Sequence, residues 1–322
     1  MIKIFSILLL NNLLILIYLK KISKIVNIFD KPDKHLKKHK SNVPLLGGVI
    51  MIINLLILSI FSIFSGIPFE NLLVSKKEYV SIFLLVSGFF LLGLYDDRFK
   101  LNPDKKFILS IILAILALTL NKNLLIENFN LSFYDKTIIL NEFSFFFTLF
   151  CIIILINALN FYDGINGQSL IFFIIVFGYL SLQSPLQLLY LILIFICVFI
   201  LFLNLKNKVF LGDSGIYVLG SILVILLIYE HNTFRTIKFA DEIFLLLILP
   251  GVDLLRLTLT RIINGKSAFY GDRNHIHHLL IKKYSLLFSN FTLFSISVIP
   301  VILYTYLKFS FFFVFFIFFF IF

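Results

Sequence analysis

Two adjacent carboxylates, Asp96 and Asp97, stand at the end of a long apolar stretch and are followed at once by Arg98. Neighbouring carboxylates at a membrane edge repel each other, so the pair favours a bound cation, a shared proton or a cationic partner. A solvated helix end with Arg98 as the partner explains the pair equally well. Taken alone, the pair does not separate chemistry from structure.

Amide and carboxylate side chains recur at steps of three in Asn157, Asn160 and Asp163, with Gly164 and Gly167 close behind. Residues three apart share one face of a helix, and glycines let a backbone approach a ligand closely. The competing interpretation is that these polar groups join neighbouring helices. Because polar side chains at the end of an apolar span are costly unless they bind something, ligand binding is favoured.

A lone carboxylate, Asp213, lies between Gly212 and Gly215 and shortly after Phe210, just before another apolar stretch. Oxygen ligands such as Asp213 suit Mg²⁺, which usually keeps waters and takes further ligands from substrate phosphates. A simple turn is the alternative.

The sharpest local signal is the segment 271–278, which holds Arg273 and the histidines His275, His277 and His278. Three histidines could bind zinc, but no cysteine or nearby carboxylate completes a closed tetrahedral site. Arginine and histidine are natural donors to phosphate oxygens, so phosphate binding is favoured over zinc and over a purely structural role.

Upstream of this segment, the spacing of Asp253 and Arg256 predicts an ion pair within one helix.

The elements that position these groups must be membrane helices, because 60% of the 322 residues are hydrophobic and 14% are charged, against roughly 25% charged in soluble domains. We therefore expect an all-α, polytopic membrane helix bundle of about 10–11 transmembrane helices, forming a single integral-membrane domain over residues 1–322. Apolar runs of suitable length lie at about 2–19, 45–66, 79–95, 107–120, 143–158, 169–182, 187–203, 214–230, 243–260, 286–306 and 309–322.

The distribution of Lys and Arg predicts the orientation of these spans. Twenty of the 28 basic residues fall on the side that contains loop 20–44, and eight fall on the other side. If the richer side is cytoplasmic, all the polar segments described above face the cytoplasm and build one active site from helix ends. The net charge of +11 therefore reflects short membrane loops, and we expect no nucleic-acid partner.

These motifs together resemble the polyprenyl-phosphate N-acetylaminosugar-1-phosphate transferases, the MraY/WecA-like family of the glycosyltransferase family 4 type. The resemblance runs in order over roughly residues 30–280. It rests on Asp96-Asp97, Asn157-x-x-Asn160-x-x-Asp163-Gly164, Phe210-x-Gly212-Asp213-x-Gly215, Pro250-x-x-Asp253 and Gly271-Asp272-Arg273-x-His275-x-His277-His278.

The resemblance implies a multi-pass enzyme of the cytoplasmic (inner) cell membrane with its site facing the cytoplasm. It would transfer an N-acetylhexosamine 1-phosphate from a UDP-sugar to polyprenyl (undecaprenyl) phosphate, releasing UMP. The product would feed cell-envelope polysaccharide such as wall polymer, lipopolysaccharide or O-antigen. Polyprenyl phosphate, the UDP-sugar and the membrane are the expected partners, and a homodimer is left open.

The same resemblance implies roles for individual residues. Mg²⁺, or Mn²⁺ as the alternative, would be held by Asp213 with Asn160 as second ligand. The remaining roles divide into catalytic residues (Asp96, Asp97, Asp163 and His275) and substrate-binding residues (Lys106, Asn166, Phe210, Arg273, His277 and His278). The sequence departs from the family pattern at Asn166, where Asp is common, and at Gln168-Ser169, where Leu-Ala is usual.

A transporter or flippase for a phosphorylated lipid or anion is the alternative from another class, since it would also carry charges in membrane helices. Such proteins often show internal repeats and polar groups at mid-depth. Here we find no repeat, and the polar groups gather at one predicted face.

We expect four of these positions to be reachable from the cytoplasm, because the charge asymmetry and the clustering of motifs agree independently. Single cysteines near each position, in a background that lacks Cys151 and Cys197, should react with an impermeant thiol reagent only from that side. Labelling from outside intact cells would contradict the one-site arrangement at any of Asp96, Asp163, Asp213 or His277.

Overall fold

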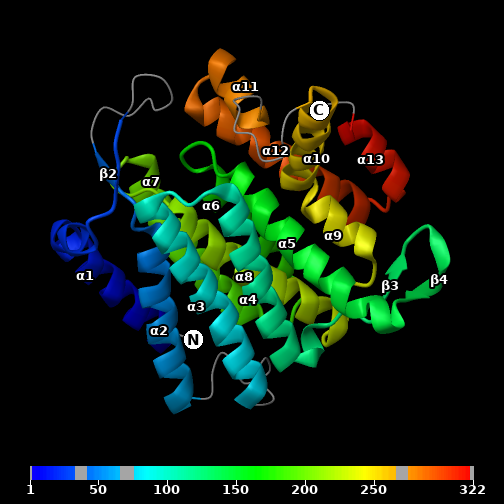
Figure 1. Cartoon of the computed structure of the whole chain (residues 1–322), viewed down its shortest axis with the longest axis horizontal. Coiled ribbons are helices and arrows are strands. Elements are labelled where there is room, and N and C mark those ends of the chain that lie inside the picture. The colour runs from blue at the N-terminus through cyan, green and yellow to red at the C-terminus, as the bar shows by residue number, and fades with distance from the viewer. Residues whose placement is uncertain (1, 33–41, 66–75, 266–274, 320–322) are drawn as a thin grey trace. The chain divides into compact units, whose positions relative to one another are not determined.

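The computed structural model of the chain describes residues 2–32, 42–65, 76–265 and 275–319 (Figure 1). These residues form thirteen α-helices, two short 3-10 helices and two small sheets of two antiparallel strands each. The predicted all-α fold class is confirmed.

Among the described residues, seven helices are long and apolar enough to cross a membrane. An eighth span results if α9 and α10, which meet at a bend of 81°, are one broken span. The chain is therefore a multi-pass membrane protein. The number is below the 10–11 predicted because several apolar runs make poorer spans. Helix α6 has 14 residues, α4 begins with Asp104, Lys105 and Lys106, and the described part of α13 has 9 residues.

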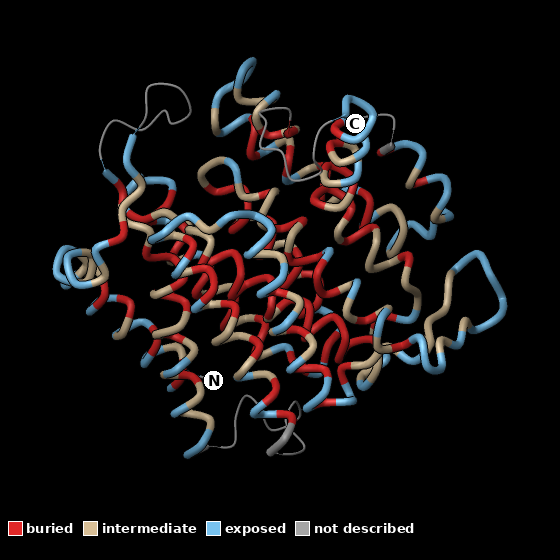
Figure 2. The backbone as a smooth tube through the Cα atoms, in the orientation of Figure 1, coloured by how far each residue is buried: buried red, intermediate tan, exposed pale blue. Residues whose placement is uncertain are grey.

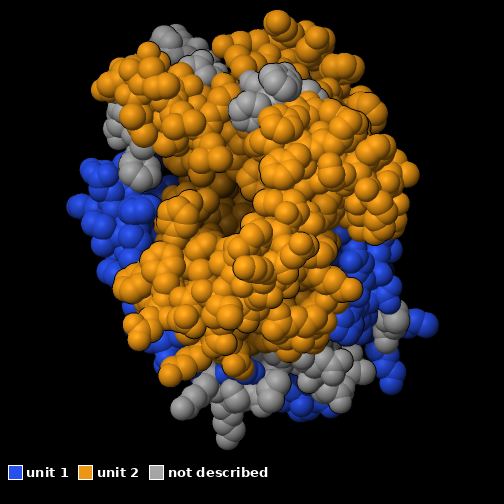
Figure 3. Space-filling model, turned by 90° about the vertical axis from the view of Figure 1, so that its right-hand side faces the viewer, with its two compact units in different colours: residues 1–120, 177–222 blue, residues 121–176, 223–322 orange. Residues whose placement is uncertain are grey.

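The helices belong to two compact units, shown in different colours in Figure 3, of which the first comprises residues 1–120 and 177–222. The second comprises residues 121–176 and 223–322. The single domain expected from the sequence stays a prediction, and each unit is described here by itself.

The first unit is built from membrane helices joined by a two-residue strand pair. Its elements are α1 (Ile2–Val26), β1 (Phe29–Asp30), β2 (Val43–Pro44), α2 (Gly47–Ser65), α3 (Lys76–Phe99), α4 (Pro103–Leu120), the end of α6 (Gln168–Ser181), α7 (Gln187–Leu205) and the first half of α8 (Gly212–Asn232).

A polar contact joins α1 to α2 within this unit. The Asn54 side chain donates to Asn12 Oδ1 at 3.0 Å and accepts from Asn11 Nδ2 at 3.1 Å. Amide groups facing lipid would be costly, so this exchange pairs the Asn54 amide with both asparagines of α1 and fixes the register of the two helices. The Asn12 Nδ2 group has no partner among the described residues.

Glycines allow three segments of the first unit to approach within backbone contact. A Cβ at Gly93 of α3 would lie 2.5 Å from Ser214 Cα, and one at Gly48 of α2 would lie 2.5 Å from Ser214 Oγ. Real Cβ atoms do not tolerate such distances, so α2 and α3 reach the start of α8 only because these residues have no side chain. Helix α2 begins at Gly47, the first residue of this glycine pair.

The second unit contains a β-hairpin, seen at the right of Figure 1, and a group of helices. Its elements are the 3-10 helices Lys122–Leu124 and Asn141–Phe143, β3 (Asn128–Leu131), β4 (Tyr134–Ile139), α5 (Ser144–Tyr162), the start of α6, the second half of α8, α9 (Ala240–Leu246), α10 (Ile248–Ile263), α11 (Ile276–Lys283), α12 (Leu286–Thr305) and α13 (Phe311–Phe319).

A buried carboxylate attaches the hairpin to the helices of this unit. Asp241, at the start of α9, accepts from the Ser132 N–H at 2.8 Å and from the Tyr304 hydroxyl of α12 at 2.7 Å. The three elements are thus joined through one side chain.

Burial distinguishes α8 from the other candidate spans (Figure 2). In α8 89% of the span residues are buried, whereas the other candidate spans lie between 22% and 50%. Protein therefore surrounds α8 along nearly its whole length, and its first turn carries Asp213.

Candidate functional site

The predicted site residues of the first unit gather at the ends of three helices. We name this group the aspartate-lysine cluster: Asp96, Asp97, Lys106 and Asp213. Helix α3 ends after the two carboxylates at Phe99, where the next residue adopts a φ of 52°. Helix α4 begins at Pro103, a favoured first helical residue, and Lys106 lies in its first turn.

Lys106 bridges two carboxylates in this cluster. Its Nζ lies 2.5 Å from Asp96 Oδ2 and 2.7 Å from Asp213 Oδ2. The Asp213 side chain is 32% exposed whereas that of Asp96 is 9% exposed, so Asp213 is the carboxylate that a ligand from outside can reach.

Asp97 has a different task. Its Oδ1 accepts from the Asp213 N–H at 2.8 Å and its Oδ2 from the Ser214 N–H at 3.0 Å. The carboxylate therefore satisfies two of the unpaired N–H groups at the start of α8. Gly212 makes this possible, since its φ is +70° and a Cβ there would lie 2.7 Å from Asp97 Oδ2.

The charges of the cluster suit a divalent cation. Three carboxylates face one lysine, which leaves an excess of two negative charges if all four groups are ionised. Carboxylate oxygens are the ligands that Mg²⁺ prefers, and Asp213 is open to an approaching phosphate ligand. The residues of this unit thus fit the metal that the sequence predicts.

Phe210 precedes the cluster and is held by its backbone. Its N–H donates to the Pro44 carbonyl and its carbonyl accepts from the Gly47 N–H, both at 3.0 Å. The Phe210 side chain is half-buried, so part of its ring surface remains open to contact.

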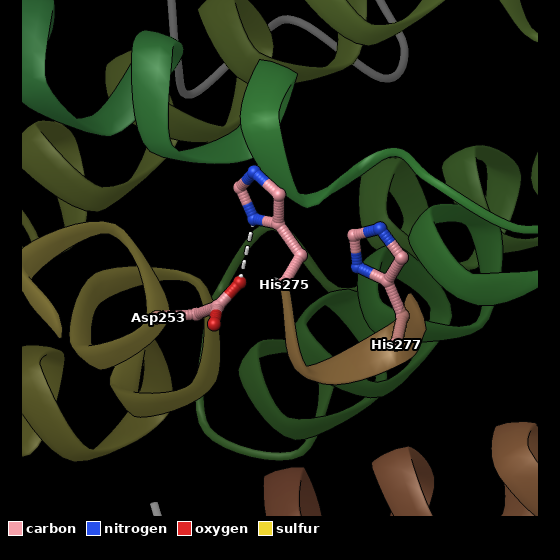
Figure 4. Close-up of side chains that lie close together, drawn as sticks. All are labelled: Asp253, His275 and His277. Carbon is pink, nitrogen blue, oxygen red and sulfur yellow. Dashed lines mark hydrogen bonds and ion pairs between the residues drawn. The ribbon is translucent and has the colours of Figure 1, made fainter. Parts of the chain in front are cut away.

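A second group lies in the other unit and consists of Asp253, His275, His277 and His278, which we name the histidine cluster. Figure 4 shows Asp253, His275 and His277, with the His275 ring directed at Asp253 and the His277 ring beside it. The two histidine rings lie nearly parallel, with centroids 5.3 Å apart. Asp253, His275 and His277 are buried, and His278 is half-buried.

Asp253 is the centre of this cluster. Its Oδ1 accepts from Arg256 Nη2 at 2.8 Å, which confirms the ion pair within α10. Its Oδ2 lies 2.8 Å from His275 Nδ1, and its Oδ1 also accepts from the Ile276 N–H at 3.3 Å, at the start of α11. Asp253 therefore orients the His275 ring and directs its Nε2 away from the carboxylate.

The prediction that no carboxylate lies near the histidines is wrong, because Asp253, 22 residues before His275 in the sequence, lies beside its ring. One donor atom each from Asp253, His275 and His277 lies within 4.8 Å of the others, so a metal ion has to be considered. However, both Asp253 oxygens already accept from Arg256 and His275, and His277 Nδ1 already faces Gln168 Nε2 at 3.2 Å. This arrangement suits binding of an anion better than binding of zinc.

His277 is neutral at physiological pH. Burial, together with the nearby His278 and His275, lowers its pKa to about 3. A neutral imidazole donates from one nitrogen and accepts at the other.

The loop between α5 and α6 carries the other predicted residues of this unit. The Asp163 carboxylate accepts from Ser169 Oγ at 2.7 Å, and the Asn166 carbonyl accepts from Asn290 Nδ2 at 2.8 Å. Asn160, one turn before Asp163, is half-buried. The loop is thus fixed from α6 and α12, with Asp163 half-buried at its start.

The structure brings together Asp96, Asp97, Lys106 and Asp213 in one unit, and His275, His277 and His278 in the other. The pairing of Asn160 with Asp213 as metal ligands stays a prediction, as does a single site for both clusters. Arg273 lies outside the described residues. The sequence reasoning missed Gln168 as a partner of His277, for which the only signal was a departure from the family pattern.

Comparison with known proteins matches residues 79–231 to the family model described as glycosyl transferase family 4. The chain is similar to that family over this segment. It contains three of the five motifs, around Asp96, Asp163 and Asp213, and the resemblance seen in the sequence is confirmed.

Curated relatives extend the similarity over most of the chain. Each is an undecaprenyl-phosphate alpha-N-acetylglucosaminyl 1-phosphate transferase. The protein of Escherichia coli (strain K12) is 28% identical over 84% of this chain and 73% of its own length. That of Salmonella typhi is 29% identical over 82% and 71%, and that of Haemophilus influenzae is 28% identical over 85% and 77%.

The packing of Gly164 against His277 gives a direct test of the second unit. A methyl group at Gly164 would lie 1.8 Å from His277 Nε2, whereas one at Gly178 of α6 would meet no atom within 4 Å. We expect Gly164→Ala to destabilise the protein by about 1–3 kcal/mol through overpacking. Gly178→Ala should be neutral or stabilising by about 0.4–1 kcal/mol.

Thermal unfolding of both variants in the same detergent measures the difference. Equal melting temperatures for Gly164→Ala and Gly178→Ala would contradict the close approach of the loop to His277.

Proposed function

We propose that this protein transfers an N-acetylhexosamine 1-phosphate from a UDP-sugar to undecaprenyl phosphate and releases UMP. The similarity over 84% of the chain to transferases of this description, with the acidic motifs intact, carries the proposal. The product, a lipid-linked diphosphate sugar, would serve cell-envelope polysaccharide synthesis. The site would face the cytoplasm, at the inner membrane.

In the proposed reaction an oxygen of the lipid phosphate attacks the β-phosphorus of the UDP-sugar. The bond from the β-phosphorus to the bridging oxygen breaks, and UMP leaves with the electron pair. Such transfer depends on alignment and on neutralisation of phosphate charge more than on covalent catalysis.

The residues of the aspartate-lysine cluster suit these tasks. Lys106 contacts Asp96 and Asp213 through a long flexible side chain, and it would turn to phosphate oxygens when the substrates bind. Asp96 would keep the lipid phosphate deprotonated and aligned. Because both Asp97 oxygens accept backbone N–H groups, we assign Asp97 to holding the start of α8 rather than to nucleophilic attack.

Asp213 would hold Mg²⁺ or Mn²⁺, with Asn160 as the second ligand implied by the family resemblance. A bound Mg²⁺ would neutralise the charge of the diphosphate and of the departing UMP. Asp213 is the suitable ligand because it is the most accessible carboxylate of a cluster with excess negative charge.

The histidine cluster would bind phosphate oxygens. Arg256 and the His275 Nδ1–H already satisfy Asp253, so the Nε2 on the other side of the His275 ring remains for an anion. The family resemblance adds His278 and Arg273 as further phosphate-binding residues and Asp163 as a catalytic residue. Phe210 and Asn166 would bind uracil, through stacking and hydrogen bonds respectively.

A transporter or flippase would bind the same lipid phosphate but would release no UMP. The purified protein should be incubated with undecaprenyl phosphate, Mg²⁺ and a panel of UDP-N-acetylhexosamines. Release of UMP together with a lipid-linked sugar supports the proposal. Binding of the lipid with no UMP from any sugar would overturn it.

Metal dependence tests the role of Asp213. We expect EDTA to abolish UMP release and Asp213→Asn to lose most of the activity, because the main site for neutralising diphosphate charge is removed. Asp135→Asn, the same change on the exposed β4 strand, should keep wild-type activity. Turnover in EDTA at the wild-type rate, or a fully active Asp213→Asn, would contradict the assignment.

Nucleotide recognition tests Phe210 and Asn166. Stacking of an aromatic ring on a base contributes about 1–3 kcal/mol, so Phe210→Ala should weaken UDP-sugar binding by roughly tenfold or more. Stacking tolerates any base, whereas an amide can both donate to and accept from the uracil edge. Asn166→Leu should therefore also reduce discrimination against other nucleotides.

The measurement is the apparent affinity for the UDP-sugar substrate and for competing nucleotides. Phe146→Ala, at a phenylalanine that is 63% exposed, is the matched control and should bind normally. Unchanged affinity in a folded Phe210→Ala protein would place the uracil elsewhere.

A further inference from the structure

Gln168, the first residue of α6, is a buried amide that the proposed reaction does not use. It is 1% exposed and lies between two segments of the second unit. Its Oε1 lies 3.4 Å from the Gly164 N–H, and its Nε2 lies 3.2 Å from His277 Nδ1.

The backbone contact decides which way the Gln168 amide points. A backbone N–H can only donate, so the side-chain oxygen faces Gly164 and the NH₂ group faces His277. His277 Nδ1 must then accept. Since the ring is neutral, its proton resides on Nε2.

The protonated nitrogen of His277 faces Gly164. A Cβ at this glycine would lie 1.8 Å from Nε2, and Gly164 itself is exposed. Among the described residues no acceptor takes the Nε2–H. The His277 Nε2–H donor therefore lies directly below Gly164, which has no side chain to cover it, in the loop that carries Asp163.

We propose that Gln168 is a positioning residue of the transfer reaction: it holds His277 in the tautomer that offers Nε2–H to a phosphate oxygen of the substrates. This inference rests on the proposed function. In the other tautomer Nε2 would carry a lone pair, which repels a phosphate oxygen. The Gln168 amide thus determines whether His277 Nε2 is a hydrogen-bond donor or an acceptor.

The surroundings of His277 agree with this role. The titratable groups that act on it are His278 and His275 of its own segment and Asp253 of α10. Burial and the two histidines keep the ring neutral, so its donor depends on the tautomer and not on an added proton.

Three variants separate positioning from packing. Gln168→Leu removes the donor to Nδ1 and frees the tautomer. Gln168→Glu keeps the shape but reverses the hydrogen bond, because a carboxylate accepts from Nδ1–H and leaves Nε2 without a proton. Gln183→Leu makes the first change at an exposed glutamine and is the control.

We expect Gln168→Leu to lower kcat by about 10–100-fold, by analogy with the loss of partners that orient metal-ligating histidines. Gln168→Glu should be similarly slow at high pH. Its activity should recover as the pH falls, because one added proton on the Glu-His pair restores Nε2–H. Gln168→Leu should instead keep the pH profile of the wild type, and Gln183→Leu should match the wild type throughout.

The tautomer is read independently of activity, from ¹⁵N spectra of histidine-labelled protein in nanodiscs, with the other five histidines assigned by substitution. The wild type should carry its proton on Nε2 of His277, and Gln168→Glu at high pH should carry it on Nδ1. A proton on Nδ1 in the wild type would overturn the inference.

The rate of UMP release by the wild type and the Gln168 variants is the second test of the positioning role. If the wild type releases UMP and folded Gln168→Leu keeps kcat within threefold, the positioning role is wrong while the proposed function stands. If the wild type releases no UMP, the proposed function fails, and the spectra alone decide whether Gln168 sets the tautomer. A loss of activity in Gln168→Glu that is equal at every pH would mark a packing defect and overturn the inference.

Discussion

The first unit depends on one carboxylate in the last turn of α3 that pairs with the start of α8. Asp97 accepts the backbone N–H groups of Asp213 and Ser214, 116 and 117 residues further along the chain. The first N–H groups of any helix lack partners within it, and leaving them unpaired away from water is costly. The start of α8 is therefore tied to the end of α3, and Asp213 comes to Lys106 as a consequence.

In the second unit, too, a carboxylate accepts hydrogen bonds at the start of a helix, here α11. Asp253 accepts from a guanidinium, an imidazole and the Ile276 N–H, and so joins α10 to the start of α11. A buried carboxylate with a single partner would be expensive, whereas one with three donors is satisfied and orients them. The direction of the His275 ring follows from this charge balance, which leaves its Nε2 for another group.

The sequence predicts the parts of this molecule that have a local cause. The presence of α3 and α5 and the Asp253–Arg256 ion pair follow from apolar length and helical spacing. The Asp253–His275 contact could not be predicted in this way, because neither segment carries a sequence signal that the two lie together. Among the described residues seven or eight helices have the length and composition of a span, because α4 carries more charge and α6 is shorter than the other candidates.

The contacts of Lys106 likewise join segments that the sequence alone does not bring together. The family resemblance implies that Lys106 binds substrate, and in the structure it lies between Asp96 and Asp213. The contact with the two aspartates and the expected contact with phosphate have the same electrostatic cause. The negative carboxylates hold the lysine ammonium group until a phosphate, which carries more negative charge, binds nearby. A group of acids that binds a lysine in this way can accept Mg²⁺ without unfavourable repulsion, since the lysine can turn to the phosphates that come with the metal. The contact seen here therefore supports the assigned role of Lys106, and it explains why three carboxylates can be kept together at the end of a membrane helix.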